Sequence, residues 1–245
     1  PVSRTGHLQI APALMGVEIE QNLLFDVTLH AATVLSTIVV LWSEVARLLR
    51  GLFSRRFNEE QAYVLKLLLS MIPIGIVGFT LKDRLDALLE SPAILLVVGC
   101  MLLVTAALLA FAYYAKPRQK AQLSYRDAFL IGVAQAVAAL PGLSRSGSTV
   151  ATGLLLGNRK QTVAQFSFLM VLAPILGETF LELMKGNLGA QAIGSAPLAA
   201  GFVAAFVVGC LACKFMIEIV KRGKLVWFAL YCAAAGTVSI LSYVL

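Results

Sequence analysis

Two short stretches of this chain carry residue types that can bind and transform an anion. The first is Ser3–Gly6 (SRTG), which His7 follows directly, and the second is Ser144–Gly147 (SRSG). Each stretch combines hydroxyl donors and a glycine with an arginine, whose planar guanidinium matches the geometry of phosphate oxygens. Because one copy lies in each half of the chain, we interpret the two stretches as parts of an internal repeat.

The second copy belongs to a longer polar loop, Pro141–Thr149, within an apolar segment. Its glycines permit positive φ angles and close approach of a ligand to the backbone. Successive N–H groups at the start of a helix form a concavity that binds anions. The loop lacks the Gly-Lys-Ser ending of nucleotide-binding loops, so a nucleotide is not indicated. The candidate binding residues of this loop are Gly142, Ser144, Arg145, Ser146, Gly147, Ser148 and Thr149.

A structural role is the alternative for these loops. Arg145 could pair with carbonyl groups or a carboxylate and simply hold the two halves of the protein together. An arginine within a membrane is costly and usually functional, and the second copy beside His7 favours a functional site. His7 could then act as a nucleophile, a general acid or a hydrogen-bond donor.

The composition of the chain indicates the membrane as its environment. Of 245 residues, 59% are hydrophobic and 13% charged, and the mean hydropathy is +0.86. A soluble domain would carry about 25% charged residues. The net charge is +7, and the basic residues lie in short loops between apolar runs. They therefore reflect membrane topology and do not indicate a nucleic-acid partner.

Six apolar runs approach the length of about 20 residues that a helix needs to cross a bilayer. A seventh segment, 128–157, is broken in its middle by the polar loop, and we predict that it forms a re-entrant helix pair. The six predicted crossings are 28–45, 62–81, 92–114, 166–184, 197–220 and 225–245.

Basic residues are distributed unequally between the loops of this layout. Far more of them lie in the loops that we place inside the cell than in those outside, as the positive-inside rule requires. The inside loops carry Arg47, Arg50, Arg55, Arg56, Lys116, Arg118, Lys120, Arg126, Arg159, Lys160, Lys221, Arg222 and Lys224, and the outside loops carry Lys82, Arg84 and Lys185.

The order of these elements predicts an inverted repeat. One polar motif followed by three crossings places the second half upside down relative to the first, so that the two motifs can meet near the membrane midplane. We therefore predict an all-α polytopic membrane protein with two inverted repeats, each a re-entrant helix pair plus three transmembrane helices. Residues 1–245 form a single integral membrane domain, with a first repeat over 1–114, which we expect to be incomplete at its N-terminus, and a second over 115–245.

The chain resembles the undecaprenyl-diphosphate phosphatases of bacteria, the BacA-type bacitracin-resistance family. The resemblance rests on PVSRTGHL at 1–8, IGVAQAVAALPGLSRSGSTVATGLLLG at 131–157 and FSFLMVLAPILG at 166–177. It implies a hydrolase of the bacterial cytoplasmic (inner) membrane that removes the terminal phosphate of a C55 polyprenyl diphosphate. This reaction recycles the lipid carrier of peptidoglycan synthesis, and the pocket is expected to face the periplasm or outer side.

The resemblance also implies the residues of the site. It implicates the serine and histidine of the first motif and the serine and arginine of the second in catalysis. Those positions are Ser3, His7, Ser144 and Arg145, with Thr5 and Gly6 beside the substrate. The family usually has a second serine, proposed as the nucleophile, where this chain has Arg4. His7 is therefore the better candidate nucleophile here, and Arg4 could contact the second phosphate.

Three further expectations follow from the resemblance. The acidic motif of the family lies upstream of Pro1, so its glutamates, possible ligands of Mg²⁺ or Ca²⁺, have no counterpart to assign in this chain. Gln135, nine residues before Ser144, is where the inverted copy would place the counterpart of one of them. A homodimer is a further possible state.

Two other functions share features with this sequence. A polyprenyl-phosphate flippase or transporter could use the same inverted-repeat pocket, since broken helices are also a transport architecture. Lipid phosphatases of the acid-phosphatase type are suggested by Thr5-Gly6-His7. That family needs a second catalytic histidine, and the chain has only two histidines, of which His30 lies in a predicted crossing. We therefore reject the acid-phosphatase type.

Overall fold

The computed structural model describes residues 23–54, 56–89, 91–114, 120, 122–184 and 195–244. The predictions for Ser3, Arg4, Thr5, Gly6 and His7 lie outside this part of the chain. The second motif and the segments around it lie within it.

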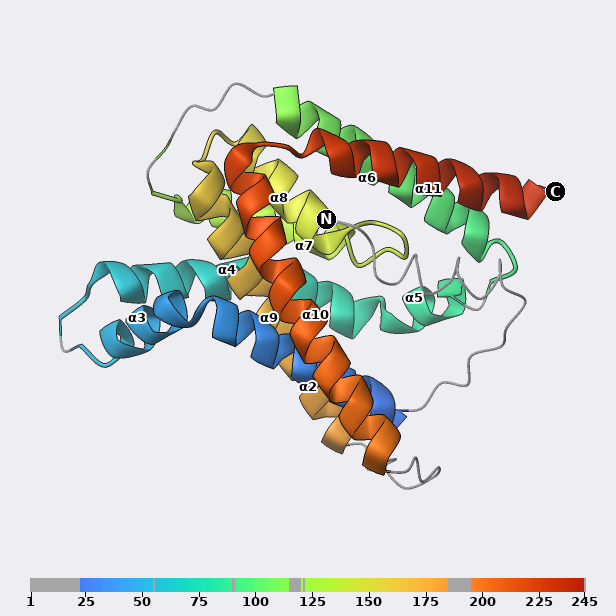
Figure 1. Ribbon diagram of the computed structural model, residues 1–245. Helices are drawn as coiled ribbons and strands as arrows, with labels where there is room; N and C mark the ends of the chain where they lie inside the picture. Colours follow the sequence, from blue (N-terminus) through green and yellow to red (C-terminus); the bar gives the residue numbers. More distant parts are fainter. Residues whose placement is uncertain are drawn as a thin grey trace. The chain divides into compact units, whose positions relative to one another are not determined.

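Helices make up nearly all of the described chain, and no β-strand is found in it, which confirms the all-α prediction (Figure 1). They are α2 (Leu23–Val40), α3 (Trp42–Leu52), α4 (Glu59–Thr80), α5 (Lys82–Leu89), α6 (Ile94–Tyr114), α7 (Tyr125–Val137), α8 (Arg145–Leu155), α9 (Lys160–Met184), α10 (Ser195–Arg222) and α11 (Val226–Val244).

Four of the described helices are long and apolar enough to cross a membrane, and they come from α4, α6, α10 and α11. The prediction of a continuous crossing over 28–45 was wrong. The helix breaks at Leu41, and α3 leaves α2 at an angle of 82°. The break has a sequence cause, since the apolar α2 gives way to a helix in which Glu44, Arg47 and Arg50 recur on one face. Together the two helices would make a fifth crossing element.

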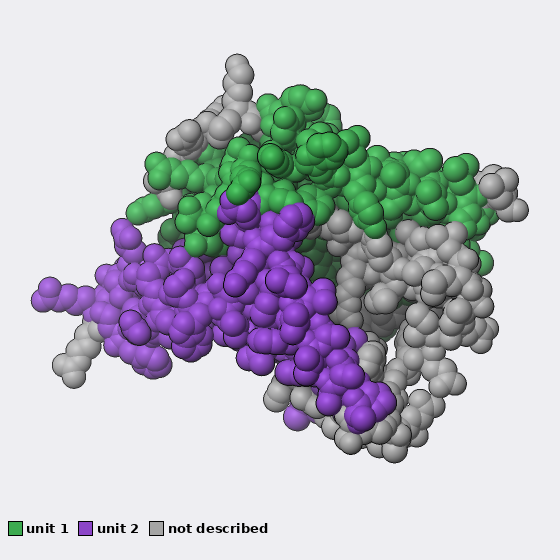
Figure 2. Space-filling model, viewed as in Figure 1, with its two compact units in different colours: residues 1–19, 66–167, 219–245 green, residues 20–65, 168–218 purple. Residues whose placement is uncertain are grey.

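The chain divides into two compact units, which Figure 2 colours separately. One unit contains 1–19, 66–167 and 219–245, and so includes α6, α7, α8 and α11. The other contains 20–65 and 168–218, and so includes α2 and α3. Each unit is described by itself below. The second motif lies wholly within the first unit.

Helices α6 and α11 pack side by side and antiparallel (Figure 1). The Ser239 hydroxyl donates to the Leu95 carbonyl at 2.7 Å, and Gly99 and Gly236 face each other. A Cβ added to either glycine would lie within 3 Å of the other's carbonyl oxygen, so both small residues are needed for this close approach. The antiparallel direction is the one that inversion requires of the last helices of the two repeats. The inverted repeat as a whole stays a prediction, because its first motif lies outside the described residues.

In the other unit, α2 and α10 also approach closely through a small residue. A Cβ on Gly209 would collide with the Ser36 side chain, and the Cys210 thiol donates weakly to the Ser36 carbonyl at 3.9 Å. Cys210 and Cys213 therefore lie on a packed helix, and both are free thiols.

Candidate active site in the helical hairpin

The segment predicted to be re-entrant forms a helical hairpin of α7 and α8. The two helices pack against each other and are joined by the turn at residues 138–144. They contain 13 and 11 residues, about 20 and 17 Å at the helical rise, and neither can cross a hydrocarbon layer of about 30 Å. The break predicted from the polar loop is therefore confirmed.

The turn of the hairpin presses its tip against α6. Gly142 has a φ of 90°, in the left-handed region that favours glycine. A Cβ at this position would lie 2.7 Å from both the Cα and the carbonyl oxygen of Val98. Backbone atoms, unlike side-chain atoms, cannot relieve such a clash by a change of rotamer. Glycine is thus required here by both the conformation and the space.

Ser144 begins helix α8 and arranges its first turn. The Ser144 hydroxyl accepts the Gly147 N–H at 3.1 Å, and its carbonyl accepts the Ser148 N–H at 2.8 Å. A helix leaves its first N–H groups without intrahelical acceptors. Those of Arg145 and Ser146, which precede the two bonded groups, are therefore the ones that the helix itself leaves for an anion. The Ser144 hydroxyl still holds its own proton, which it can donate.

Two buried polar side chains of the hairpin lack hydrogen-bond partners among the described residues. Gln135 of α7 is fully buried and Ser148 of α8 is 2% exposed. Neither amide atom of Gln135 nor the Ser148 hydroxyl has a hydrogen-bond partner among the described residues. Buried polar groups are normally satisfied, and leaving one unpaired costs about 1–3 kcal/mol. Such groups are suited to a polar ligand that supplies the missing bonds.

Arg145 provides the positive charge of the hairpin. It is the first residue of α8 and is partly exposed, next to the buried Ser144. Its cation and the positive end of the α8 dipole both favour an anion at this point. Thr149, in the next turn, is buried and donates its hydroxyl to the Ser146 carbonyl at 3.2 Å, so it orders the turn.

Sequence reasoning did not identify Thr105 of α6 as part of this site. The Thr105 hydroxyl accepts the Ser144 N–H at 3.1 Å and donates to the Met101 carbonyl at 3.0 Å, and the residue is fully buried. It thereby fixes the residue from which α8 starts. No signal in the sequence separates it from other threonines in apolar helices, since its partner is 39 positions away.

Replacing Thr105 by valine is expected to disturb the site without removing any residue from the hairpin. The shape is retained, but the buried Ser144 N–H loses its acceptor, which costs about 1–3 kcal/mol. We expect kcat for the hydrolysis that the family resemblance implies to fall about tenfold. The measurement is phosphate release in detergent. The serine variant keeps the acceptor and should restore turnover; equal rates for Thr105→Val and wild type would show that this bond does not position α8.

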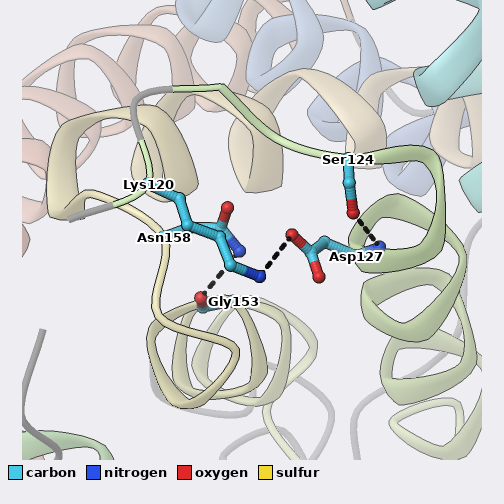
Figure 3. A network of polar contacts seen from close by, with 5 residues as sticks. All are labelled: Lys120, Ser124, Asp127, Gly153 and Asn158. Atoms are coloured by element: carbon cyan, nitrogen blue, oxygen red, sulfur yellow. Dashed lines mark hydrogen bonds and ion pairs between the residues drawn. The ribbon is translucent and has the colours of Figure 1, made fainter. Parts of the chain in front are cut away.

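A second polar network closes the open end of the hairpin (Figure 3). The Lys120 ammonium lies 3.4 Å from the carboxylate of Asp127, which is 3% exposed. The backbone N–H of Lys120 donates to the Gly157 carbonyl at 3.1 Å. The side-chain amide of Asn158 donates to the Gly153 carbonyl at 3.2 Å. The segment before α7 is thus tied to the end of α8. This network lies at the far end of the hairpin from the turn and has a structural role.

The same network lowers the pKa of Asp127. Burial raises this pKa, but hydrogen bonds from Ser124, Asn158 and Lys120, together with the Lys120 charge, outweigh burial and hold it below its ordinary value of 3.8. A lowered pKa means that the ionised form stabilises the fold above the ordinary value. This stabilisation is lost as the pH falls below 3.8 and through the folded-state pKa.

Asp127→Asn is therefore expected to lower stability in a pH-dependent way. At pH 7 the variant should lose about 1–3 kcal/mol, since charge-assisted bonds are replaced by neutral ones. The difference in thermal midpoint between wild type and variant should shrink as the pH is lowered from 5 toward about 3. Thermal unfolding in detergent at a series of pH values measures it. A difference that stays constant down to that pH would contradict a stabilising carboxylate.

Every predicted site residue that the structure describes lies on the hairpin of α7, the turn and α8, and their role in a site stays a prediction. Gln135 lies on α7, Gly142 in the turn, and Ser144, Arg145, Ser146, Gly147, Ser148 and Thr149 at the start of α8. Within the described ranges, no group of three His, Cys, Asp or Glu side chains is arranged to hold a metal ion. No chemical step is assigned to a metal from these residues.

These features define a class of protein. It is a multi-pass helical membrane protein in which a short helical hairpin carries a cationic, anion-attracting helix start into a buried setting. The sequence profile described as "Bacitracin resistance protein BacA" matches residues 1–238. The chain belongs to this family.

Proteins named undecaprenyl-diphosphatase are similar to this chain over nearly its whole length. That of Parabacteroides distasonis is 61% identical over 243 residues, which cover 98% of this chain and 91% of the relative. That of Bacteroides fragilis is 60% identical over the same shares. A more distant one, from Methanosphaera stadtmanae, is 31% identical over 261 residues, with 98% of this chain and 91% of the relative covered.

Proposed function

We propose that this protein hydrolyses undecaprenyl diphosphate to undecaprenyl phosphate and inorganic phosphate in the membrane. The observation that carries the proposal is the start of α8. There Arg145 and two N–H groups belong to the same helical hairpin as buried polar atoms that lack partners among the described residues. The name shared by the relatives supplies the substrate. An anionic head group complements the positive charge of Arg145. An apolar tail matches the apolar helices around it.

In this proposal α8 binds the diphosphate. Arg145 grips phosphate oxygens with two N–H groups at once, as guanidinium forks do. The N–H groups of Arg145 and Ser146 and the hydroxyl of Ser148 donate to the same oxygens. These donors are already in place, so they can stabilise the negative charge that develops during phosphoryl transfer at little cost in reorganisation. Gln135 supplies or accepts a further hydrogen bond from α7.

We assign the reacting group to the first motif, which lies outside the described residues. Either His7 attacks the terminal phosphorus, or it transfers a proton while another group attacks. In the first case the bond from the phosphorus to the bridging oxygen breaks, undecaprenyl phosphate leaves, and water then releases phosphate from the histidine. Ser3 and Thr5 would donate to the phosphate, with the Gly6 backbone beside it, and Arg4 would contact the second phosphate.

A divalent cation, Mg²⁺ or Ca²⁺, remains part of the proposal, with ligands outside the described residues. Hydrolysis by the purified protein is expected to fall to background when EDTA is added and to return when Mg²⁺ or Ca²⁺ is restored in excess. Phosphate release with each cation measures the requirement. Undiminished turnover in EDTA would remove the cation from the reaction.

We place the protein in the bacterial cytoplasmic membrane, with the site open to the periplasmic or outer side. The positive-inside loop charges support the side on which each loop is placed, and the family resemblance is the basis for the side on which the site opens. A homodimer is included as a possible state, to be measured by the mass of the protein in detergent. Labelling of cysteines introduced into the two sets of loops tests the orientation.

The deciding experiment is phosphate release from undecaprenyl diphosphate by the purified protein in detergent. No compartments exist there, so transport cannot contribute. A phosphatase releases phosphate with turnover, whereas a flippase that performs no chemistry releases none. If folded protein supplied with the cation releases no phosphate, transport would be the better supported function. Release that depends on Arg145 would support the hairpin as the active site.

A further inference from the structure

Helix α3 has the composition of a helix that lies along a membrane surface. It leaves the apolar α2 at 82°, so it runs across the direction of that helix. Its polar residues, among them Ser43, Arg47 and Arg50, recur on one side, while Trp42 and Leu49 lie toward the other. Large apolar side chains stay exposed along α3 and the loop after it. They are Trp42 (60%), Leu49 (50%), Leu52 (42%), Phe53 (84%) and Phe57 (70%). This combination is typical of interfacial helices.

A pocket of about 630 Å³ lies on the polar side of α3. It is lined by Ser43, Arg47 and Arg50, with Trp42 at its apolar edge, and by Glu60 from the start of α4. Its size is within the range of about 300–1,000 Å³ that is usual for small-molecule sites. All of its residues belong to one compact unit. It therefore does not depend on how the two units are placed.

The corner between α3 and α4 is held in shape by its own hydrogen bonds. The Asn58 side chain donates to the Gly51 carbonyl at 2.9 Å and accepts the Gln61 N–H at 2.8 Å. The Gln61 amide donates to the carbonyls of Leu52 and Ser54 at 3.1 and 3.0 Å. A Cβ on Gly51 would collide with the Glu60 side chain. The two helices thus meet closely, and the pocket between Arg50 and Glu60 is preorganised.

The charges in this pocket have both signs. Arg47 is paired with Glu44 at 2.7 Å, so its cation is partly neutralised. Arg50 and Glu60 place a guanidinium and a carboxylate on opposite helices of the same pocket. A ligand that carries a phosphate and a primary ammonium would match them. A purely anionic ligand would meet the Glu60 carboxylate, and a purely cationic one would meet Arg50.

We propose that the pocket between α3 and α4 binds the head group of phosphatidylethanolamine from the surrounding bilayer. Arg50 binds its phosphate and Glu60 its ammonium, while the acyl chains lie along the exposed apolar side chains of α3 and Trp42 anchors the rim. The lipid source follows from the position of the pocket, on an amphipathic helix that directly continues an apolar one. The bound lipid would fix α3 at the membrane surface.

Native mass spectrometry of the purified protein, titrated in detergent with three phospholipids of identical acyl chains, tests the proposal. Phosphatidylethanolamine should bind most tightly. Phosphatidylcholine should bind less tightly because its quaternary ammonium donates no hydrogen bond, and phosphatidylglycerol because it has no cation for Glu60. Arg50→Gln should weaken the binding of phosphatidylethanolamine about tenfold, which corresponds to one charge-assisted contact.

Two further variants make the result specific. Glu60→Gln should remove the preference for phosphatidylethanolamine over phosphatidylcholine while leaving phosphatidylglycerol bound at least as well as before. Arg84→Gln, an exposed arginine on α5, is the matched control and should bind all three lipids as wild type does. Thermal midpoints and phosphate release in detergent should stay at wild-type values in all three variants. Equal affinity of the wild type for the three lipids, or unchanged binding by Arg50→Gln, would overturn the proposal.

Discussion

Replacing Arg145 by alanine is expected to lower kcat/KM for undecaprenyl diphosphate by about 10²–10³, the usual loss when one preorganised donor to developing charge is removed. The expected size reflects its setting. Arg145 begins α8 next to the buried Ser144 and Ser148, where a charge-assisted contact is stronger than in water. Because its side chain is partly exposed and caps no helix, the fold should remain assembled. Phosphate release in detergent measures the rate, and thermal unfolding the fold.

Two companion variants separate geometry from charge. Arg145→Lys keeps a cation but loses the planar fork, so it should also be impaired. Turnover equal to wild type would show that a point charge suffices. Arg126→Ala removes an exposed arginine from the first turn of α7, at the other end of the hairpin, and should leave turnover within about twofold, since exposed charges contribute little. Near-normal hydrolysis by Arg145→Ala would remove this residue from the mechanism.

Replacing Gly142 by alanine is expected to have the second large effect, through assembly of the site. The left-handed conformation costs an alanine about 1–2 kcal/mol. The Cβ would also meet the Val98 backbone at 2.7 Å, and such overpacking costs about 1–3 kcal/mol more. The turn can relieve the clash only by moving away from α6, which also shifts Ser144 from Thr105. We expect a lowered thermal midpoint and at least tenfold slower phosphate release from the protein that remains folded.

Gly75→Ala is the matched control for this substitution. Gly75 lies within α4, and no atom lies within 4 Å of an added Cβ. Alanine is the better helix former by about 1 kcal/mol, so this variant should be as stable as wild type or more so. If Gly142→Ala were equally well tolerated, the contact between the turn and α6 would not support the site.

The hairpin could be predicted from the sequence because its signals are local. Pro141 and Gly142 interrupt an apolar run, and the serine-rich letters that follow match a helix start. The structure accordingly places Ser144 at the N-cap of α8. The helical character of the chain was predictable for a similar reason. Within a bilayer, each long apolar run must satisfy its backbone internally, and a helix does so without any partner.

The break between α2 and α3 has a local sequence signal, the charge periodicity of α3, which the prediction did not use. Hydropathy alone extended the first crossing to residue 45. The charges of α3 lie on one side of the helix, however, and a helix with one charged side is more stable along a surface than across a membrane. The periodicity was present in the sequence, but an average over the whole run concealed it.

The partners of the hairpin could be found only in the tertiary structure. Thr105 reaches Ser144 across 39 residues, and Val98 sets the requirement for glycine at position 142. Asn158, which follows α8, meets Lys120 and Asp127, which lie before and at the start of α7, only when the hairpin closes. Helix formation and the break in an apolar run could be predicted from local sequence, because both depend on neighbours along the chain. Which side chains support the site depends on how segments far apart in the chain pack together. A single sequence does not show which of these segments lie close in space.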